Sequence, residues 1–277
     1  MNPAAPGRWV LVGLLAAALG CGERRAQHHI AALSDADSTL RRRAAHELVV
    51  LGRPAVPLLL EAAASGSDSL QYIVAQILGS IGDARAIPSL LSLSDSPNAF
   101  VRREAVLSLG RCGVGTPAAA LVQRLASDGD AEVRGAAASA LAALRDTSAV
   151  QPLVLALSDS AAAVRRSALA SLHQLWTAAS QEAALASLSD PDETVRFIAA
   201  QIIGKRQVAV GGDLLCRALR DTSVWVRAES ARSLGLLGDP AAVESLVRLL
   251  KVCDSADCLA AREALLALTG TEYVLVP

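Results

Sequence analysis

A period of about 31 residues runs through this sequence, and it limits the possible folds more than any other feature. Seven segments share an aliphatic residue followed by arginine or, in one copy, by glutamine. These pairs are Leu40-Arg41, Leu70-Gln71, Val101-Arg102, Val133-Arg134, Val164-Arg165, Val195-Arg196 and Val226-Arg227. The intervals between successive pairs, counted along the chain, are 30, 31, 32, 31, 31 and 31. Because self-similarity at a period of about 20–50 residues is typical of stacked repeats, the sequence predicts a solenoid.

Inside each repeat the apolar residues have helical spacing. The stripe that begins at Val101 continues at i+4, i+8 and i+11, on one face of a helix. A turn such as Gly82-Asp83 follows, where glycine can end a helix, and a second apolar stripe such as that at Val243 comes next. The sequence therefore predicts an all-α fold, an α-α superhelix of about eight two-helix repeats that bury their stripes by stacking.

The chain divides into four segments by this pattern. We expect a signal peptide over residues 1–20, and a short tether with an amino-terminal half-repeat cap over 21–35. The repeat solenoid should cover 36–270, and a tail should cover 271–277.

Two recurrent phrases carry a family resemblance. Val-Arg-x-x-Ala-x-x-x-Leu-Gly and Gly-Asp-x-x-Ala-Val/Ile resemble the HEAT-like repeats of phycobilin lyases, over residues 26–270. The resemblance implies the helical solenoid. It implies little about function, because one such fold serves many unrelated tasks.

Charged residues recur in step with the repeat. Five aspartates stand five residues before the aliphatic residue of a pair: Asp35, Asp128, Asp159, Asp190 and Asp221. The arginines of the pairs are Arg41, Arg102, Arg134, Arg165, Arg196 and Arg227. Aspartate near a helix start accepts backbone amide hydrogen bonds, and the resemblance implies that the arginines bridge to aspartates of the same or adjacent repeats. We interpret the set as a structural ladder, with a row of charged binding groups as the alternative.

The segment from Met1 to Cys21 resembles an export signal. Arg8 precedes an apolar run over residues 9–19 that is too short to cross a bilayer and fits a signal peptide. The ending Gly20-Cys21 resembles that of bacterial lipoproteins, although Ala18 stands where leucine is preferred. We expect lipidation of Cys21, which would anchor the chain to a bacterial membrane on its periplasmic side. Plain secretion and a retained or chance apolar start are the alternatives.

Composition and motifs argue against several activities. The net charge of −1 disfavours a nucleic-acid partner, which requires a basic surface. His46-Glu47 resembles the His-Glu pairs of the HEAT-like di-iron enzyme deoxyhypusine hydroxylase, but it is the only such pair here, so we expect no metal or other cofactor. Our hypothesis is a non-enzymatic scaffold that mediates protein–protein interaction and binds an unknown protein or peptide. The alternative is a phycobilin-lyase-like enzyme or accessory factor.

Two of the five cysteines lie outside the repeat pattern. Cys253 and Cys258 flank a loop that extends beyond the repeat. In an oxidising compartment they could close a disulfide, and two free thiols are the alternative.

A partner surface can be sought by helical phase. If the second helix of each repeat lines the inner curve, as in related solenoids, its outward positions are Gln123, Gln151, Glu182, Asp213, Arg217, Glu244 and Arg248. This mixed, mildly polar surface would suit a protein or peptide, or would simply be solvated. Phe100 and Trp225, just before two of the pairs, either anchor an interface or pack on the preceding loop.

Overall fold

A computed structural model describes residues 22–253 and 256–273 of the chain. The expected signal segment and Cys21 therefore lie outside the described residues. The described chain forms two compact units that divide between Leu144 and Arg145, and each is treated by itself.

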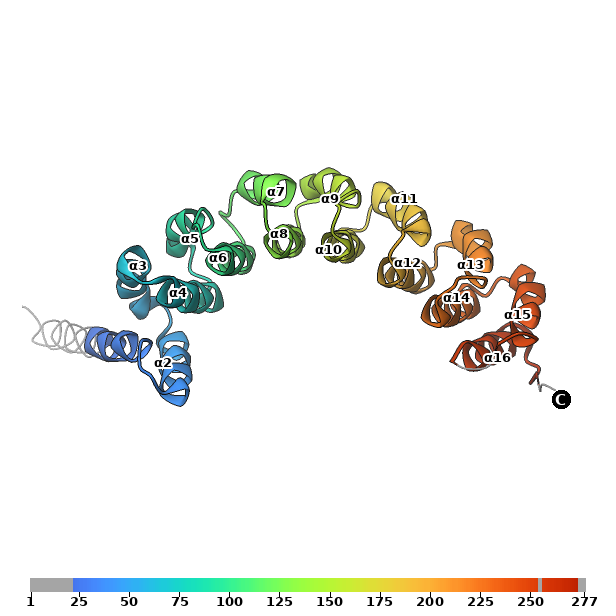
Figure 1. The fold of residues 1–277 in the computed structure, drawn as a ribbon, viewed down its shortest axis with the longest axis horizontal. Helices are drawn as coiled ribbons and strands as arrows, with labels where there is room; N and C mark the ends of the chain where they lie inside the picture. Colours follow the sequence, from blue (N-terminus) through green and yellow to red (C-terminus); the bar gives the residue numbers. More distant parts are fainter. Residues whose placement is uncertain (1–21, 254–255, 274–277) are drawn as a thin grey trace, which may run out of the picture. The chain divides into compact units, whose positions relative to one another are not determined.

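The first unit contains four successive pairs of helices in its described residues (Figure 1). They are a helix over residues 22–32 with α2 (Ser38–Leu51), α3 (Val56–Ser65) with α4 (Asp68–Ile81), α5 (Ile87–Leu93) with α6 (Ala99–Cys112), and α7 (Ala118–Ser127) with α8 (Ala131–Ala143). Short 3-10 turns lead into α3 (Arg53–Ala55) and α5 (Ala84–Ala86).

The second unit repeats this arrangement. Its pairs are α9 (Val150–Ala156) with α10 (Ala162–Gln174), α11 (Ala178–Ala186) with α12 (Glu193–Lys205), α13 (Gly212–Ala218) with α14 (Val224–Leu237), and α15 (Val243–Leu250) with α16 (Ala256–Thr269). Its 3-10 turns are Thr147–Ala149, Ser187–Ser189, Ala209–Gly211 and Pro240–Ala242. The predicted all-α repeat fold is confirmed over the described residues. Within them no single helix could cross a bilayer, and one pair, Ser38–Leu51 with Arg53–Ser65, has the necessary length and composition but is bent by 109°.

The aliphatic-arginine pairs begin the even-numbered helices, and from α6 onward the aliphatic residue is completely buried. Five of these residues are 0% exposed: Val101, Val133, Val164, Val195 and Val226. Each odd-numbered helix packs mainly on the even-numbered helix that follows it, so the structural repeat starts one helix earlier than the sequence pattern indicated.

Small residues let neighbouring even-numbered helices approach closely. A Cβ atom added at Gly79 of α4 would lie 2.3 Å from Ser108 Oγ of α6, and one added at Gly204 of α12 would lie 2.4 Å from Ser233 Oγ of α14. Both serine hydroxyls donate across the same contacts, to the carbonyl oxygens of Ala75 and Ala200, at 2.8 Å each. The even-numbered rows are therefore packed through backbone and hydroxyl groups rather than long side chains.

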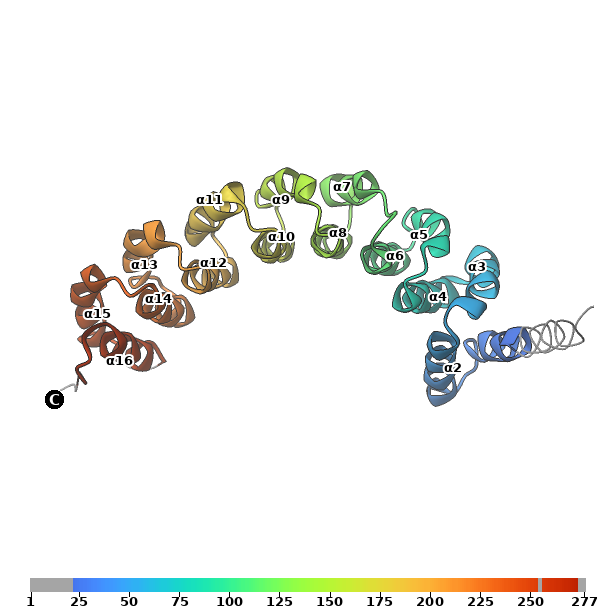
Figure 2. The same ribbon diagram turned by 180° about the vertical axis from the view of Figure 1, so that it is seen from behind.

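This close packing decides which row lies inside the bend of each unit. In either unit, seen by itself, the even-numbered helices lie on the inner side and the odd-numbered helices on the outer side (Figures 1 and 2). The helices that the sequence pattern placed second are the odd-numbered ones, so they lie on the outer side and not on the inner curve where we expected them. The residues proposed for that curve lie on the outer rows: Gln123, Gln151, Glu182, Asp213, Arg217, Glu244 and Arg248.

Candidate functional site

The arginines of the pairs connect successive even-numbered helices. In the first unit Arg102 donates from Nε and Nη2 to the two carboxylate oxygens of Asp128, at 2.9 Å each. In the second unit Arg165 does the same to Asp190 at 2.8 Å each, and Arg196 to Asp221 at 2.7 and 2.8 Å. Arg227 donates from Nε to Asp257 at 2.7 Å. We missed Asp257 as a ladder residue, although adding one period to Val226 reaches it.

Each arginine also holds its own loop. Its Nη1 donates to the backbone carbonyl six residues earlier, and these carbonyls belong to Asp35, Ser96, Asp128, Asp159, Asp190 and Asp221. The ladder aspartates accept a hydrogen bond from the backbone amide two residues later in the chain. Before α8 and α12 this amide belongs to the N-cap residue, which is Asp130 or Asp192. The aspartates therefore order the loop before the helix and do not cap the helix itself.

Arg41 makes only half of these contacts. Its Nη1 donates to the carbonyl oxygens of Asp35 and Ala36, at 2.7 and 2.9 Å, while its Nε and Nη2 donate to no group of the described chain. Five residues before Leu70, where the ladder would have an aspartate, the chain has Ser65, and Gly66 follows it at the C-cap of α3. The first position of the ladder therefore has the arginine but no aspartate.

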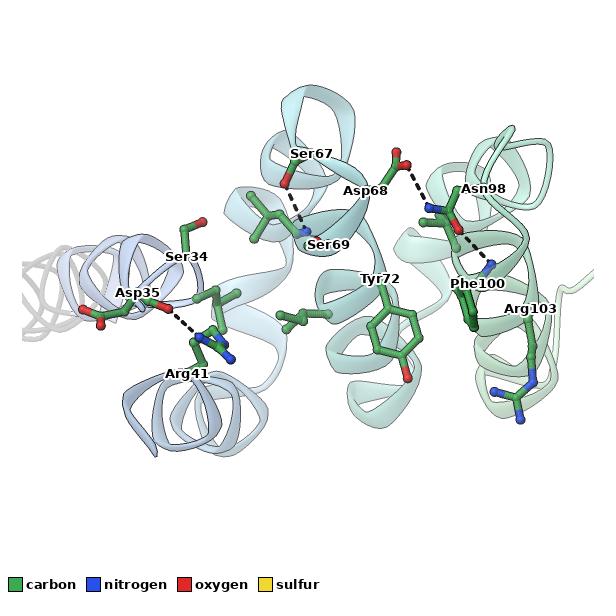
Figure 3. A pocket seen from close by; sticks show the side chains of 14 residues that line it. Ser34, Asp35, Arg41, Ser67, Asp68, Ser69, Tyr72, Asn98, Phe100 and Arg103 are labelled. Atoms are coloured by element: carbon green, nitrogen blue, oxygen red, sulfur yellow. Dashed lines mark hydrogen bonds between the residues drawn. The ribbon is translucent and has the colours of Figure 1, made fainter. Parts of the chain in front are cut away.

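A groove opens beside this arginine. Leu40 of α2 is 46% exposed, whereas the valines at the same place in the other helices are buried, so the amino end of α2 is not packed as they are. The groove has a volume of about 660 Å³ and lies across the loop before α2 and the first turns of α4 and α6 (Figure 3). Its lining includes Leu33, Asp35, Arg41, Tyr72, Ile73 and Phe100.

One wall of the groove is aromatic and fixed by a cap. Asn98 Oδ1 accepts the amide of Phe100 at 2.9 Å, and Asn98 Nδ2 donates to Asp68 Oδ2 at 2.8 Å (Figure 3). Phe100 is 71% exposed, and Tyr72 beside it is half-buried. The groove thus combines an aromatic surface with a half-buried guanidinium that has open donors, which is an arrangement suited to binding.

The family is decided by a comparison with sequence models. The model for HEAT repeats matches residues 26–110, 118–188 and 181–267. The chain belongs to the HEAT-repeat family. Among the curated proteins, no sequence matches it significantly.

Solved structures agree with this fold. The HEAT-repeat chain matches the Escherichia coli protein YibA with a TM-score of 0.65 and 21% identity, over 98% of this chain and 99% of that one. Human deoxyhypusine hydroxylase matches with a TM-score of 0.41 and 23% identity, over 91% of this chain and 98% of that one. The complex of CpcE and CpcF of phycocyanin lyase from Nostoc matches with a TM-score of 0.47 and 22% identity, over 88% of this chain and 94% of that one.

These matches correct one expectation. We expected that the chain is not an enzyme, but a hydroxylase and a lyase are among the solved structures that it matches. That expectation is withdrawn. At these identities the likeness shows the fold alone and assigns no activity to this HEAT-repeat chain.

The cysteine pair lies at the start of α16 in the second unit. Cys253 and Cys258 are joined by a disulfide with an S–S distance of 2.07 Å. Asp257, between them in sequence, is 0% exposed and accepts the hydrogen bond from Arg227. These three residues are grouped as metal ligands would be, but both sulfur atoms are bonded to each other, and the carboxylate is part of the ladder.

The seven residues on the outer rows do not gather into one site. Among them only Glu244 and Arg248 form an ion pair within the described chain. Arg248 also lines a small cavity of about 220 Å³ with Cys216 and Val252. Trp225 of α14, in the same place as Phe100, is 60% exposed, so neither aromatic packs fully on its preceding loop.

Proposed function

We propose that this HEAT-repeat chain is a scaffold that binds another protein through the groove beside α2, α4 and α6. The groove carries the proposal, because it brings an exposed phenylalanine, a tyrosine and an arginine together on one surface. Tyrosine and arginine are among the residues that dominate binding energy at protein interfaces, and a largely exposed Phe100 is stabilised by burial against a partner.

Several features of the first unit support a preformed surface. Phe100 is held by the cap at Asn98, and Val101 next to it is fully buried, so the ring projects from a rigid turn. A surface that needs little ordering on binding loses less entropy, which favours affinity. HEAT repeats commonly mediate protein–protein contacts, which agrees with this use of the groove.

A photo-crosslinking experiment tests the groove. A photoreactive residue in place of Ser69, on the groove wall, should form a discrete adduct with a partner protein in membrane extracts of the native organism. The same residue in place of Gln123, on the outer row, should not. Phe100→Ala should reduce the adduct at position 69 about tenfold, because it removes the main exposed aromatic surface.

The matched control for that experiment is Trp225→Ala. It removes an equally placed aromatic residue from the second unit, outside the groove, and should leave the adduct unchanged. Adducts that form as readily at position 123, or that survive Phe100→Ala, would show that the groove is not the binding surface.

We also propose that the scaffold is held at the periplasmic face of a bacterial membrane by lipid on Cys21. The support is the sequence alone: a basic residue, an apolar run and Gly20-Cys21. A chain made with a labelled fatty acid should carry the label, Cys21→Ala should lose it, and Cys216→Ala should keep it. Label that persists in Cys21→Ala would rule out this anchor.

A further inference from the structure

Arg41 has two donors, Nε and Nη2, that no group of the described chain accepts from. In three ladder contacts the arginine offers the same two donors, Nε and Nη2, to the two oxygens of an aspartate at 2.7–2.9 Å. Arg41 is oriented by its own loop in the same way, through the carbonyl oxygen of Asp35. Its side chain is therefore already placed to receive a carboxylate at these two donors.

The chain's neighbouring residues do not supply that carboxylate. Ser65, which holds the ladder position, donates its hydroxyl to the carbonyl oxygen of Glu61, and a Cβ atom at the following Gly66 would lie 2.7 Å from the carbonyl oxygen of Ala62. Ser67 is occupied as the N-cap of α4, and Asp68 accepts the amide of the Asn98 side chain on the far side of α4 from Arg41 (Figure 3).

The next ladder position is also changed. Where an arginine would follow Leu70, Gln71 donates from Nε2 to the carbonyl oxygen of Ala63 at 3.1 Å. Asp95 pairs instead with Arg124 of α7. Both departures lie at α4, so the ladder is interrupted where the groove opens.

We propose that Arg41 receives an aspartate or glutamate side chain from an extended segment of the partner protein, with an adjacent apolar side chain of that segment against Tyr72 and Phe100. This inference rests on the proposed function, because it names the chemistry that the groove recognises. The ligand would occupy the place that Asp128 takes against Arg102 in the same unit.

Charge and geometry favour a carboxylate. A planar guanidinium binds a carboxylate through two parallel hydrogen bonds, which gives both strength and orientation. The other cation of the groove, Arg103, already lies 3.7 Å from Glu132, and Asp35 accepts the backbone amide of Asp37. Arg41, unlike Arg103, is held in place by two backbone carbonyl oxygens and still has two donors without a partner in the described chain, so it matches one carboxylate.

A phage-displayed library of random heptapeptides, selected on the purified full-length chain, tests this proposal. The selected peptides should share an acidic residue beside an aromatic or aliphatic one. Their affinity should fall about tenfold or more when that acid becomes its amide, as expected for two charge-assisted hydrogen bonds. In Arg41→Gln the preference for the acid should disappear.

Two variants control for charge and folding. Arg42→Gln removes the same charge from the neighbouring exposed position of α2 and should keep the preference. Arg41→Lys keeps the positive charge but lacks the two parallel donors, so this variant should keep only part of the preference for the acid.

The outcomes separate this inference from the proposed function. Peptides that bind the Phe100→Ala variant more weakly but show no preference for an acid would overturn the carboxylate site. The groove would then remain the binding surface. An acid preference that survives Arg41→Gln would also overturn it. Selected peptides that are indifferent to Phe100→Ala and to Arg41→Gln would overturn both proposals.

Discussion

Replacing Arg165 by methionine is expected to lower the free energy of unfolding by about 3 kcal/mol. Methionine keeps much of the apolar stem but removes both hydrogen bonds to Asp190, and the side chains of this pair are only 10% and 9% exposed. Removing one partner of a buried ion pair leaves the other charge uncompensated, which accounts for most of the loss. Urea denaturation of the wild type and the variant measures it.

Arg41→Met is the matched control. It removes the same guanidinium from the equivalent position, but no carboxylate is left behind, because Arg41 contacts only backbone carbonyl oxygens in the described chain. Its cost should therefore stay below about 1 kcal/mol, as for exposed polar contacts. Equal losses in the two variants would show that the arginines stabilise through their own loops and not through the aspartates.

The same contact predicts how the difference depends on pH. Burial, the largest single influence on Asp190, raises its pKa, but the hydrogen bonds from Arg165 and the Asp192 amide and the nearby arginine charges together lower it below the usual 3.8. A carboxyl group whose pKa is lower in the folded than in the unfolded state stabilises the fold at every pH above its unfolded pKa. This contribution is lost as the pH falls through the folded pKa. The gap between wild type and Arg165→Met should therefore be full at pH 7 and shrink below about pH 4.

The repeat period predicted the helices and most of the ladder. It did so because the apolar stripe and the ladder charges must recur in register for the repeats to stack. The five valines of the pairs are fully buried, and Asp257, which accepts the hydrogen bond from Arg227, lies one period beyond Val226 of the last pair that we aligned. Local chemistry that repeats in register can be read from one sequence.

The side on which each unit bends could not be predicted from periodicity. It depends on which row of helices packs more closely, and therefore on contacts between separate helices, such as that of Gly79 with Ser108. The glycine and the serine are visible in the sequence, but their contact is not. We consequently placed the seven candidate residues on the inner curve, whereas they lie on the outer rows.

The groove left only faint signals in the sequence. The first interval is one residue short, and Gln71 replaces the expected arginine. Neither signal shows that the first turn of α2 stays exposed, because this follows from how α2 rests on α4. The backbone conformation of the turns that lack the Gly-Asp phrase was not predictable from the sequence either. Gln207 adopts a φ of 52°, in the place where Gly82 and Gly238 have φ values of 67° and 70°.

Gly79→Ala is expected to lower the free energy of unfolding by about 2 kcal/mol, although alanine is the better helix former. The new methyl group would lie 2.3 Å from Ser108 Oγ and 2.8 Å from Ser108 Cα, so α4 and α6 must move apart. Overpacking of this kind costs about 3 kcal/mol at the upper end of its usual range, and the gain in helix propensity returns about 1 kcal/mol. The loss should therefore exceed the gain.

A double-mutant cycle with Ser108→Gly isolates the close contact. Removing the serine side chain makes room for the methyl group, so the two changes together should be less harmful than their sum by at least about 1 kcal/mol. Gly129→Ala, at a loop position with no heavy atom within 4 Å of the added methyl group, should change stability by less than about 0.5 kcal/mol. Additive effects of Gly79→Ala and Ser108→Gly would mean that the approach of the even-numbered helices does not depend on this contact. In that case the packing of the odd-numbered helices would have to account for the bend of the unit.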